Sequence, residues 1–336
     1  MITEQAISEA LKTVMVPAAD RSLVSLNLVN KITVTEDTAE ITLANAALSP
    51  ELQEYLTDGV RAALSKFKIK NVNVTYTEAK PADLNHVSHI IAVMSGKGGV
   101  GKSAVSALLA IALQRAGNSV GILDADITGS SIPKMFGLRN HPLGSETGII
   151  PVASESGIDI ISMNLLLPEQ ESAVIWRAPL LSRAIQQFWG EVLWGNLDYM
   201  VIDLPPGTGD APLTVMQSIP IDGVVIVSTP QGLVEMIVKK AVNMAQKMEK
   251  PILGIVENMS YFYVPELKKK YELFGKSKGE ALAKMTQSPL LAQLPLDPEL
   301  ARLSDEGKIE SYQSPFVKSL GEAVLVSLQK IAEAKK

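Results

Sequence analysis

The eight residues from Gly96 to Ser103, Gly-Lys-Gly-Gly-Val-Gly-Lys-Ser, most constrain what this chain can fold into. They satisfy the spacing G-x-x-x-x-G-K-S of a phosphate-binding loop, in which glycines allow successive backbone N–H groups to face phosphate oxygens. An apolar, strand-like stretch from His89 to Met94 precedes the loop, and a stretch rich in Ala and Leu from Ala104 to Arg115 follows it. The sequence therefore predicts a strand, a loop and a helix whose N-terminus is directed at the phosphates.

The side chains of this loop suit a nucleoside triphosphate. Lys102 is placed to neutralise the β- and γ-phosphates, and the Ser103 hydroxyl is placed to ligate Mg²⁺. Lys97 is one lysine more than the pattern requires, and the alternative to a second cation at the phosphates is a solvated loop lysine. We predict that the nucleotide-binding loop consists of Gly96, Lys97, Gly98, Gly99, Val100, Gly101, Lys102 and Ser103.

Two carboxylates, Asp124 and Asp126, end an apolar run that begins at Ser119. Alternate residues of a strand leave it on the same side, so both carboxylates should face the same way. Carboxylates there can hold a Mg²⁺-bound water or orient the water that attacks the γ-phosphate. The alternative is that the two acids cap a strand-to-helix turn.

A second acidic segment begins at Asp203, after the strand-like run from Leu197 to Ile202. Asp203 is placed like a Walker B acid and is followed by two prolines that fix the exit direction of the chain. Glycines two apart then leave backbone N–H groups free to approach a γ-phosphate. We predict a switch and a magnesium site here. The switch comprises Asp124, Asp126, Asp203, Pro206, Gly207 and Gly209, and Mg²⁺ is held through water by Ser103, Asp126 and Asp203.

Length and composition favour a cytoplasmic protein of two domains. The chain has 336 residues, of which 46% are apolar and 20% charged, as is typical of a globular protein with a substantial core. The formal net charge of −5 argues against nucleic acid as a partner. Neither an apolar run of about 18 to 20 residues nor a signal peptide is evident, so no stable membrane association is expected.

The order of apolar patterns predicts a small N-terminal α+β domain, a linker and an α/β domain, at residues 1–80, 81–88 and 89–336. The N-terminal pattern is helix, strand, strand, helix, strand, at residues 4–14, 26–35, 39–43, 50–67 and 72–76. Beyond residue 89 strands alternate with helices, and further strands are expected at residues 120–123, 158–161, 199–202, 223–228, 252–256 and 290–293. This alternation predicts a mostly parallel, doubly wound sheet that binds ligands at the carboxyl ends of its strands.

Five motifs in one order carry a family resemblance. They are GKGGVGKS with its two lysines, DADITGSS from Asp124, DLPPGTGD from Asp203, ENMSYF from Glu257 and WRAP at Trp176 to Pro179. Together they resemble the Mrp/ApbC family of iron–sulfur cluster carriers, within the deviant Walker A, MinD- and ParA-like P-loop ATPases. The resemblance covers nearly the whole chain. Residues 1 to about 80 resemble the small domain, related to eukaryotic cluster-targeting factors, that precedes the ATPase in many bacterial members.

The resemblance implies a cytoplasmic homodimer that hydrolyses ATP slowly and acts in iron–sulfur cluster assembly or transfer to apoproteins. It implies three catalytic residues: Lys97, the signature lysine that reaches the partner's nucleotide across the dimer; Lys102; and Asp126, which orients the attacking water. Asp124 becomes the neighbour of Asp126 near Mg²⁺. Asn258 matches the asparagine that reads adenine, because an amide both donates and accepts hydrogen bonds. Capping of the following turn is the alternative for Asn258.

The chain departs from this family at the cluster ligands. Members usually follow the Asn-Met-Ser-Tyr-Phe segment with a Cys-x-x-Cys pair, so that two subunits supply four thiolates to one [4Fe–4S] cluster. This chain has no cysteine, and Val264 and Leu267 stand at the expected positions. Neither side chain can ligate iron. The histidines, His86, His89 and His141, lie far from this segment in the sequence and are not expected to replace the thiolates.

Three functions remain open at this point. The first is a Mrp-type ATPase in cluster delivery, with thiolates supplied by a partner or with a regulatory or docking role. The second is a cluster-free, nucleotide-gated dimeric scaffold, in which Val264 and Leu267 would suit a dry contact. The third is a MinD- or ParA-like positioning ATPase, supported by an apolar stripe at helical spacing from Phe316 to Ile331. Such a stripe more often docks on the protein's own sheet.

Overall fold

The computed structural model describes residues 2–17, 19–35, 37–168, 178–231 and 234–334. The chain divides into two compact units, the first of residues 1–88, 140–153 and 187–198 and the second of residues 89–139, 154–186 and 199–336. The first unit therefore includes two segments from the middle of the chain. A single boundary between residues 80 and 89 stays a prediction.

The first unit is an α+β domain with the predicted order helix, strand, strand, helix, strand. Its sheet has the order β3-β4-β5, in which β4 pairs antiparallel with β3 and parallel with β5. Ser49 caps the intervening helix by accepting a hydrogen bond from the Leu52 N–H. The short strands β1 and β2 have no counterpart in the prediction. The elements are α1 (Glu4–Leu11), β1 (Met15–Val16), β2 (Arg21–Ser22), β3 (Val29–Val34), β4 (Thr38–Ala44), α2 (Pro50–Leu64), β5 (Asn71–Thr77), α3 (Pro81–Leu84), β8 (Gly144–Ser145), β9 (Gly148–Ile149) and β10 (Val152–Ala153).

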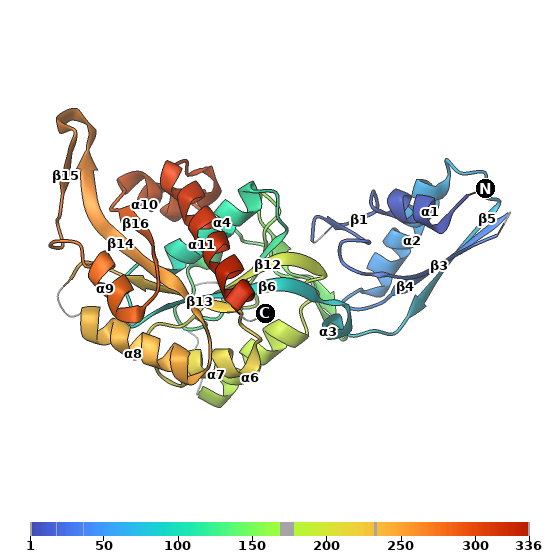
Figure 1. Ribbon diagram of the computed structural model, residues 1–336. Coiled ribbons are helices and arrows are strands. Elements are labelled where there is room, and N and C mark those ends of the chain that lie inside the picture. The colour runs from blue at the N-terminus through green and yellow to red at the C-terminus, as the bar shows by residue number, and fades with distance from the viewer. Residues whose placement is uncertain (1, 18, 36, 169–177, 232–233, 335–336) are drawn as a thin grey trace. The chain divides into compact units, whose positions relative to one another are not determined.

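The second unit is built on a mostly parallel sheet, which confirms the predicted α/β class. Its strands follow the order β11-β7-β12-β6-β13-β14, with β16 paired to β14 and β15 antiparallel to β14 at one edge. Helices α4 and α11 lie on one side of the sheet, and α7 and α8 lie on the other (Figure 1). The strands are β6 (His86–Ser95), β7 (Val120–Asp124), β11 (Asp159–Ile161), β12 (Asn196–Asp203), β13 (Gly223–Ser228), β14 (Ile252–Val264), β15 (Lys269–Tyr271) and β16 (Leu290–Pro295).

The helices of this unit connect the strands in the doubly wound manner. They are α4 (Lys102–Arg115), α5 (Ile132–Met135), α6 (Ala178–Gly190), α7 (Asp210–Ser218), α8 (Val234–Lys247), α9 (Gly279–Thr286), α10 (Pro298–Asp305) and α11 (Pro315–Ala334), with short 3₁₀ turns at Met163–Leu165, Pro265–Leu267 and Ile309–Ser311. All six residues of β13 are buried, as expected of a parallel strand covered on both faces. Register pairing sets Asp203 beside Asp124, so the carboxyl ends of β12 and β7 meet at one edge.

Several strands differ from their predicted bounds by a few residues, and β14 is much longer than predicted. The predicted strand ends at Val256, with Asn258 just past it, whereas β14 continues through Asn258 to Val264. The last three residues of the extension, Phe262 to Val264, pair antiparallel with β15, a strand that is not among those predicted. Glu257 and Tyr261 pair with β16 instead, and together these pairings supply the backbone hydrogen bonds that keep the extension extended.

The apolar stripe of the C-terminal segment is docked, as the alternative interpretation held. Within α11, Val317, Leu320, Val324 and Leu328 are buried. No helix among the described residues is both long and apolar enough to cross a membrane. Trp176 and Arg177 of the WRAP motif lie outside the described residues.

The docked stripe yields a stability prediction. Leu320→Ala removes a fully buried side chain and is expected to lower the free energy of unfolding by about 2 to 5 kcal/mol. Val326→Ala, at a half-exposed position of the same helix, should change it by no more than about 0.5 kcal/mol. Urea unfolding of both variants measures the difference. Equal effects would mean that this face of α11 does not pack on the sheet.

Candidate nucleotide-binding site

The predicted phosphate-binding loop lies between the end of β6 and the start of α4, and glycine is required at several of its positions. Gly99 and Gly101 both have a φ of 79°, in the left-handed region that side chains disfavour. A Cβ atom on Gly96 would lie 2.0 Å from Cγ2 of Ile237. Gly101 also caps α4, whose first residue is Lys102. The glycine spacing is therefore a packing requirement as well as a conformational one.

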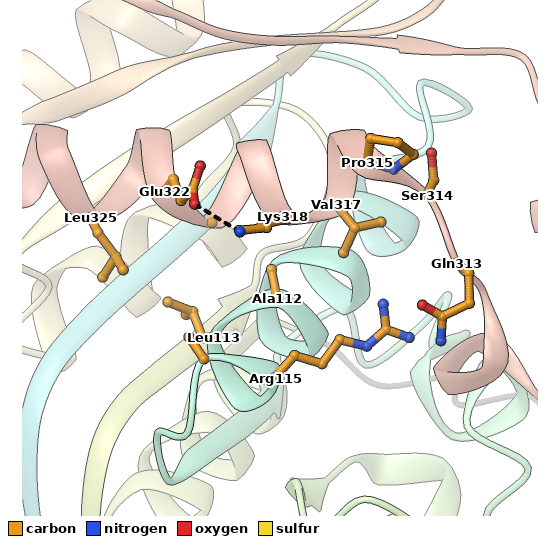
Figure 2. A pocket seen from close by; sticks show the side chains of 12 residues that line it. Ala112, Leu113, Arg115, Gln313, Ser314, Pro315, Val317, Lys318, Glu322 and Leu325 are labelled. Atoms are coloured by element: carbon orange, nitrogen blue, oxygen red, sulfur yellow. Dashed lines mark ion pairs between the residues drawn. The ribbon is translucent and has the colours of Figure 1, made fainter.

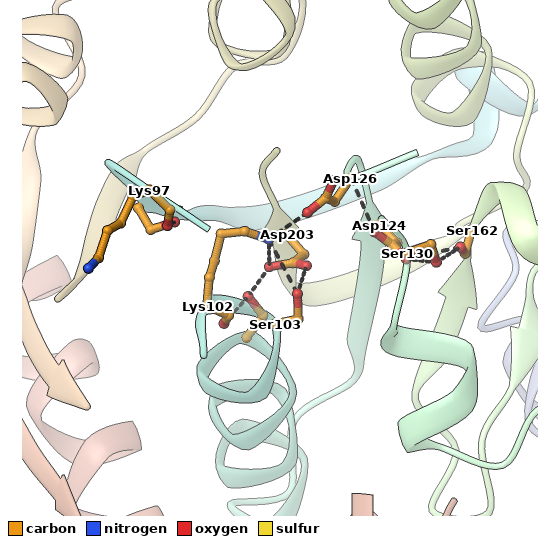
Figure 3. Close-up of polar contacts among 10 residues, drawn as sticks. Lys97, Lys102, Ser103, Asp124, Asp126, Ser130, Ser162 and Asp203 are labelled. Carbon is orange, nitrogen blue, oxygen red and sulfur yellow. Dashed lines mark hydrogen bonds and ion pairs between the residues drawn. The ribbon is translucent and has the colours of Figure 1, made fainter. Parts of the chain in front are cut away.

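Lys102 and Ser103, the side chains predicted to meet phosphate and Mg²⁺, converge on one carboxylate (Figure 3). The Lys102 Nζ lies 2.8 Å from Oδ1 of Asp203 and 3.5 Å from Oδ2 of Asp126. The hydroxyls of Ser103 and Ser106 each donate to Asp203 at 2.6 Å. Asp203 is fully buried, and these donors satisfy both of its oxygens. Sequence reasoning missed Ser106, although it lies one helical turn after Ser103.

Asp124 and Asp126 lie in different surroundings. Asp124 is fully buried and accepts hydrogen bonds from the Ser130 hydroxyl and, at 2.9 Å, from the Ser162 hydroxyl. Burial raises the pKa of Asp124 to about 7, and the neighbouring Asp203 carboxylate raises it in the same direction. Neither serine was named by sequence reasoning. Ser130 belongs to the DADITGSS motif, but Ser162 comes from a distant strand end and leaves no local signal.

Asp126 faces a cavity of about 250 Å³ at the loop. Lys97, Gly98, Ser103 and Pro206 also line this cavity. Burial raises the pKa of the Asp126 carboxyl, and the nearby Lys102 ammonium opposes that rise. The cavity therefore joins one partly accessible carboxylate with the backbone and side chains of the loop.

The predicted switch segment is bonded to the strand that carries the loop. The N–H of Gly207, where φ is 90°, donates to the carbonyl of Ser95 at 2.9 Å. Gly209 is extended and precedes Asp210, the first residue of α7. Pro206 lines the same cavity as the loop. A movement of this turn would therefore act on both the loop base and the start of α7.

Two residues assigned by resemblance do not join the carboxylate cluster. Lys97 points away from the pair formed by Lys102 and Asp203 (Figure 3), and its Nζ donates to Oε1 of Gln231 at 2.7 Å. Asn258 is buried and donates from Nδ2 to the carbonyl of Val100 at 2.9 Å. Asn258 therefore holds the loop in place in this structure. Its contact with adenine and the trans action of Lys97 stay predictions.

The side-chain oxygens around Lys102 fit Mg²⁺ as ligands. Mg²⁺ prefers oxygen ligands and is usually held by one or two carboxylates, waters and substrate phosphates. The hydroxyl of Ser103 and the carboxylates of Asp126 and Asp203 are such oxygens, and in this structure the Lys102 ammonium faces the two carboxylates. Among the residues that the structure describes, no group of three or more His, Cys, Asp or Glu side chains is arranged to hold a metal ion unaided.

Comparison with known protein families shows the family to which the chain belongs. Residues 86–332 match the family described as NUBPL iron-transfer P-loop NTPase. The chain belongs to this iron-transfer P-loop NTPase family. Residues 4–76 match a second family, described as iron-sulfur cluster assembly protein. The two matches together cover both the N-terminal α+β fold and the nucleotide site.

Relatives of the same family resemble the chain over much of its length. The iron-sulfur cluster carrier protein of Synechocystis is 38% identical over 324 residues, which are 91% of each chain. That of Methanocaldococcus jannaschii is 48% identical over 227 residues, which are 67% of this chain and 78% of that one. These matches bear out the family resemblance of the five motifs.

Solved structures agree on the fold of the NTPase unit. The nucleotide-binding protein from Archaeoglobus fulgidus, in complex with ADP, is 46% identical with a TM-score of 0.62 and covers 68% of this chain and 90% of its own. Cyanothece McdA in an ATP complex is 16% identical with a TM-score of 0.51, covering 72% of this chain and 96% of its own, and shows the shared fold alone.

This member of the iron-transfer P-loop NTPase family has no residues that fit an iron–sulfur cluster at the expected place. Val264 is the last residue of β14, and Leu267 lies in the 3₁₀ turn that follows, with 58% of its surface exposed. The whole chain contains no cysteine. Because such clusters are held mainly by thiolates, this segment cannot ligate one by itself.

The close approach of the loop to β14 yields a prediction about two glycines. A Cβ on Gly101 would lie 2.1 Å from Nδ2 of Asn258, whereas a Cβ on Gly98 meets no atom within 4 Å. Gly101→Ala should therefore lower the free energy of unfolding by about 1 to 3 kcal/mol, since the left-handed backbone adds strain to the clash.

The matched control is Gly98→Ala, which should change the free energy of unfolding by no more than about 0.5 kcal/mol. Urea unfolding of the nucleotide-free protein measures both variants. If they behave alike, the contact between Asn258 and the loop does not constrain residue 101.

Proposed function

We propose that this protein is an ATP-driven switch that acts in the assembly or transfer of iron–sulfur clusters to apoproteins. The observation that carries the proposal is the convergence of Lys102, Ser103 and Asp203 at a phosphate-binding loop in a chain of the iron-transfer P-loop NTPase family. The loop glycines provide backbone donors for phosphate, and Lys102 provides the charge. The relatives' carrier names support the cluster-related role.

The residues around the phosphate-binding loop would have different roles in binding Mg²⁺ and ATP. Ser103, Asp126 and Asp203 would hold Mg²⁺, which when bound neutralises charge on the phosphates of ATP. Lys102 exchanges its contact with Asp203 for the phosphates, and Asp203 keeps the hydroxyls of Ser103 and Ser106. Binding of ATP would therefore rearrange an ion pair that is already formed in this structure.

Asp126 is the proposed acid that orients the attacking water. It faces the cavity beside the loop, and its raised pKa makes the carboxylate a better acceptor for a proton of that water. Asp124 supports it from behind, because the Asp126 N–H donates to Oδ1 of Asp124 at 3.2 Å. After hydrolysis the turn at Gly207 is released, and its bond to Ser95 transmits the change to the loop base.

We propose that the protein acts in the cytoplasm as a homodimer with slow turnover. Lys97 bonds Gln231 of its own chain in this structure and takes no part in the carboxylate cluster. In the dimer its ammonium would leave Gln231 and complete the partner subunit's site, as an arginine finger does. The γ-phosphate then serves mainly to hold the closed form, which is why turnover should be slow.

A second candidate function is a nucleotide-gated scaffold that binds no cluster. The observation that favours it is the absence of cysteine from the whole chain, with Val264 and Leu267 at the ligand positions. In the first candidate the thiolates come from a partner or client protein. A positioning ATPase that uses its C-terminal helix on a membrane is less favoured, because the apolar face of α11 is buried.

Lys97→Ala tests the dimer-dependent mechanism. The variant should bind ATP as the wild type does, since Lys97 lies outside the carboxylate cluster, but its hydrolysis should fall by about 10³-fold or more. Binding of a fluorescent ATP analogue and phosphate release measure the two properties. Lys102→Ala is the control and should lose ATP binding. Unchanged turnover in Lys97→Ala would remove the case for a trans-acting lysine.

Anaerobic reconstitution with iron and sulfide separates the two candidate functions. The chain alone should acquire no cluster by iron and sulfide counts and by visible absorption, because it lacks thiolates. The double variant Val264→Cys with Leu267→Cys should gain one, and Val326→Cys with Lys330→Cys is the matched control on α11. A cluster that forms only when a client apoprotein is also present, and that is then found on this apoprotein, would favour the carrier.

The opposite result is equally informative. A near-stoichiometric cluster on the cysteine-free wild type would show that ligands other than cysteine hold it. Absence of any cluster or transfer alongside intact ATPase activity would favour the scaffold.

A further inference from the structure

The side chain of Lys97 is held in place by one side chain of its own chain. Its Nζ donates to Oε1 of Gln231 at 2.7 Å, and both residues are half-buried. Lys97 lies two residues past the end of β6, and Gln231 lies three residues past the end of β13. Figure 3 shows the Lys97 side chain pointing away from Lys102 and Asp203. The hydrogen bond therefore keeps the Lys97 ammonium away from the phosphate site of its own chain.

The acceptor of this hydrogen bond is neutral. An amide oxygen binds an ammonium more weakly than a carboxylate does, because one of the two groups carries no charge. Among the residues that the structure describes, Lys97 forms no ion pair. Partial burial excludes some of the water that would compete for the ammonium. The bond can therefore hold Lys97 in one direction and still be weak enough to break.

The loop around Lys97 leaves its side chain as the part that can move. A Cβ on Gly96 would lie 2.0 Å from Cγ2 of Ile237, so the backbone here is packed against α8. The carbonyl of Lys97 also accepts from the Ser95 hydroxyl at 3.0 Å. The four-carbon stem of a lysine, by contrast, is flexible. Redirecting the ammonium therefore requires the bond to Gln231 to break and does not require the backbone to move.

We propose that Gln231 is a positioning residue that restrains Lys97 in the monomer and thereby weakens the ATP-bound dimer. This inference deepens the proposed function and rests on its homodimer, in which Lys97 completes the partner subunit's site. Each subunit gives up its bond between Lys97 and Gln231 before its lysine reaches across. The free energy of two such bonds therefore opposes dimer formation.

The restraint makes dimer formation depend on the bound nucleotide. Phosphate oxygens are charged and bind an ammonium more strongly than a neutral amide does. Without nucleotide, the carboxylates of the facing site are already paired with Lys102 and offer Lys97 little in return. Gln231 thus keeps Lys97 from the interface until the facing site contains a nucleotide.

Dimerisation of the full-length protein at a saturating concentration of a non-hydrolysable ATP analogue tests the proposal. Gln231→Leu keeps the size of the side chain and removes the acceptor. Each bond should contribute about a factor of five at this partly exposed site, so the dimer dissociation constant should fall by about 25-fold. Gln231→Glu turns the bond into an ion pair and should raise this constant by about fivefold or more. Analytical ultracentrifugation measures both constants. A merely structural role would weaken the dimer in both variants.

Acetylation of the nucleotide-free protein tests the bond itself. Acetic anhydride reacts with uncharged amines, and donation to Gln231 stabilises the charged form of Lys97. Gln231→Leu should therefore raise the acetylation rate of Lys97 severalfold relative to that of Lys318, as measured by peptide mass spectrometry. Lys318 is a suitable reference because its side chain is 82% exposed on α11, where its ammonium lies 3.7 Å from Glu322 (Figure 2).

The matched control is Gln246→Leu, the same change at an exposed position of α8, which should leave both measurements at their wild-type values. An unchanged or weaker dimer in Gln231→Leu, or acetylation of Lys97 at the wild-type rate in that variant, would overturn the proposal. If neither the wild type nor Gln231→Leu forms a dimer, the proposed homodimer itself fails, and the acetylation rates still decide whether Gln231 holds Lys97.

Discussion

The ion pair between Lys102 and Asp203 is the interaction on which the nucleotide site depends. Both side chains are nearly or fully buried, and withdrawing two charges from water costs several kcal/mol for each. The cost is offset because Asp203 also accepts the hydroxyls of Ser103 and Ser106. The pair joins the start of α4 to the end of β12, so the helix and the strand that deliver the chemistry are fixed to each other before any ligand arrives.

Much of this arrangement follows from local sequence patterns. β13 begins and ends at the predicted residues because a continuous apolar run has few alternatives in a covered parallel sheet. Asp124 and Asp203 come together because both end strands that are neighbours in register. The contact of Ser162 with Asp124 joins residues 38 positions apart and leaves no local trace. The extension of β14 likewise depends on β15, whose exposed, lysine-rich sequence gives no strand signal by itself.

The β14–β15 hairpin, which carries Val264 and Leu267, is held in shape by bonds within the chain. Glu257 closes its base through hydroxyl and backbone donors, and antiparallel pairing of β14 with β15 supports the arms. The Glu257 carboxylate therefore joins the two arms of the hairpin at their base. The shape of the hairpin therefore follows from hydrogen bonds of its own residues.

The contact between Asn258 and the phosphate-binding loop has a consequence for how this sequence can change over time. Residue 101 has no space for a Cβ while asparagine occupies position 258, and Asn258 in turn holds the carbonyl next to that glycine. A larger residue at position 101 needs a smaller one at position 258, and either substitution alone would distort the loop. The two positions should therefore change only as a pair, so that asparagine at position 258 is inherited together with the loop's last glycine.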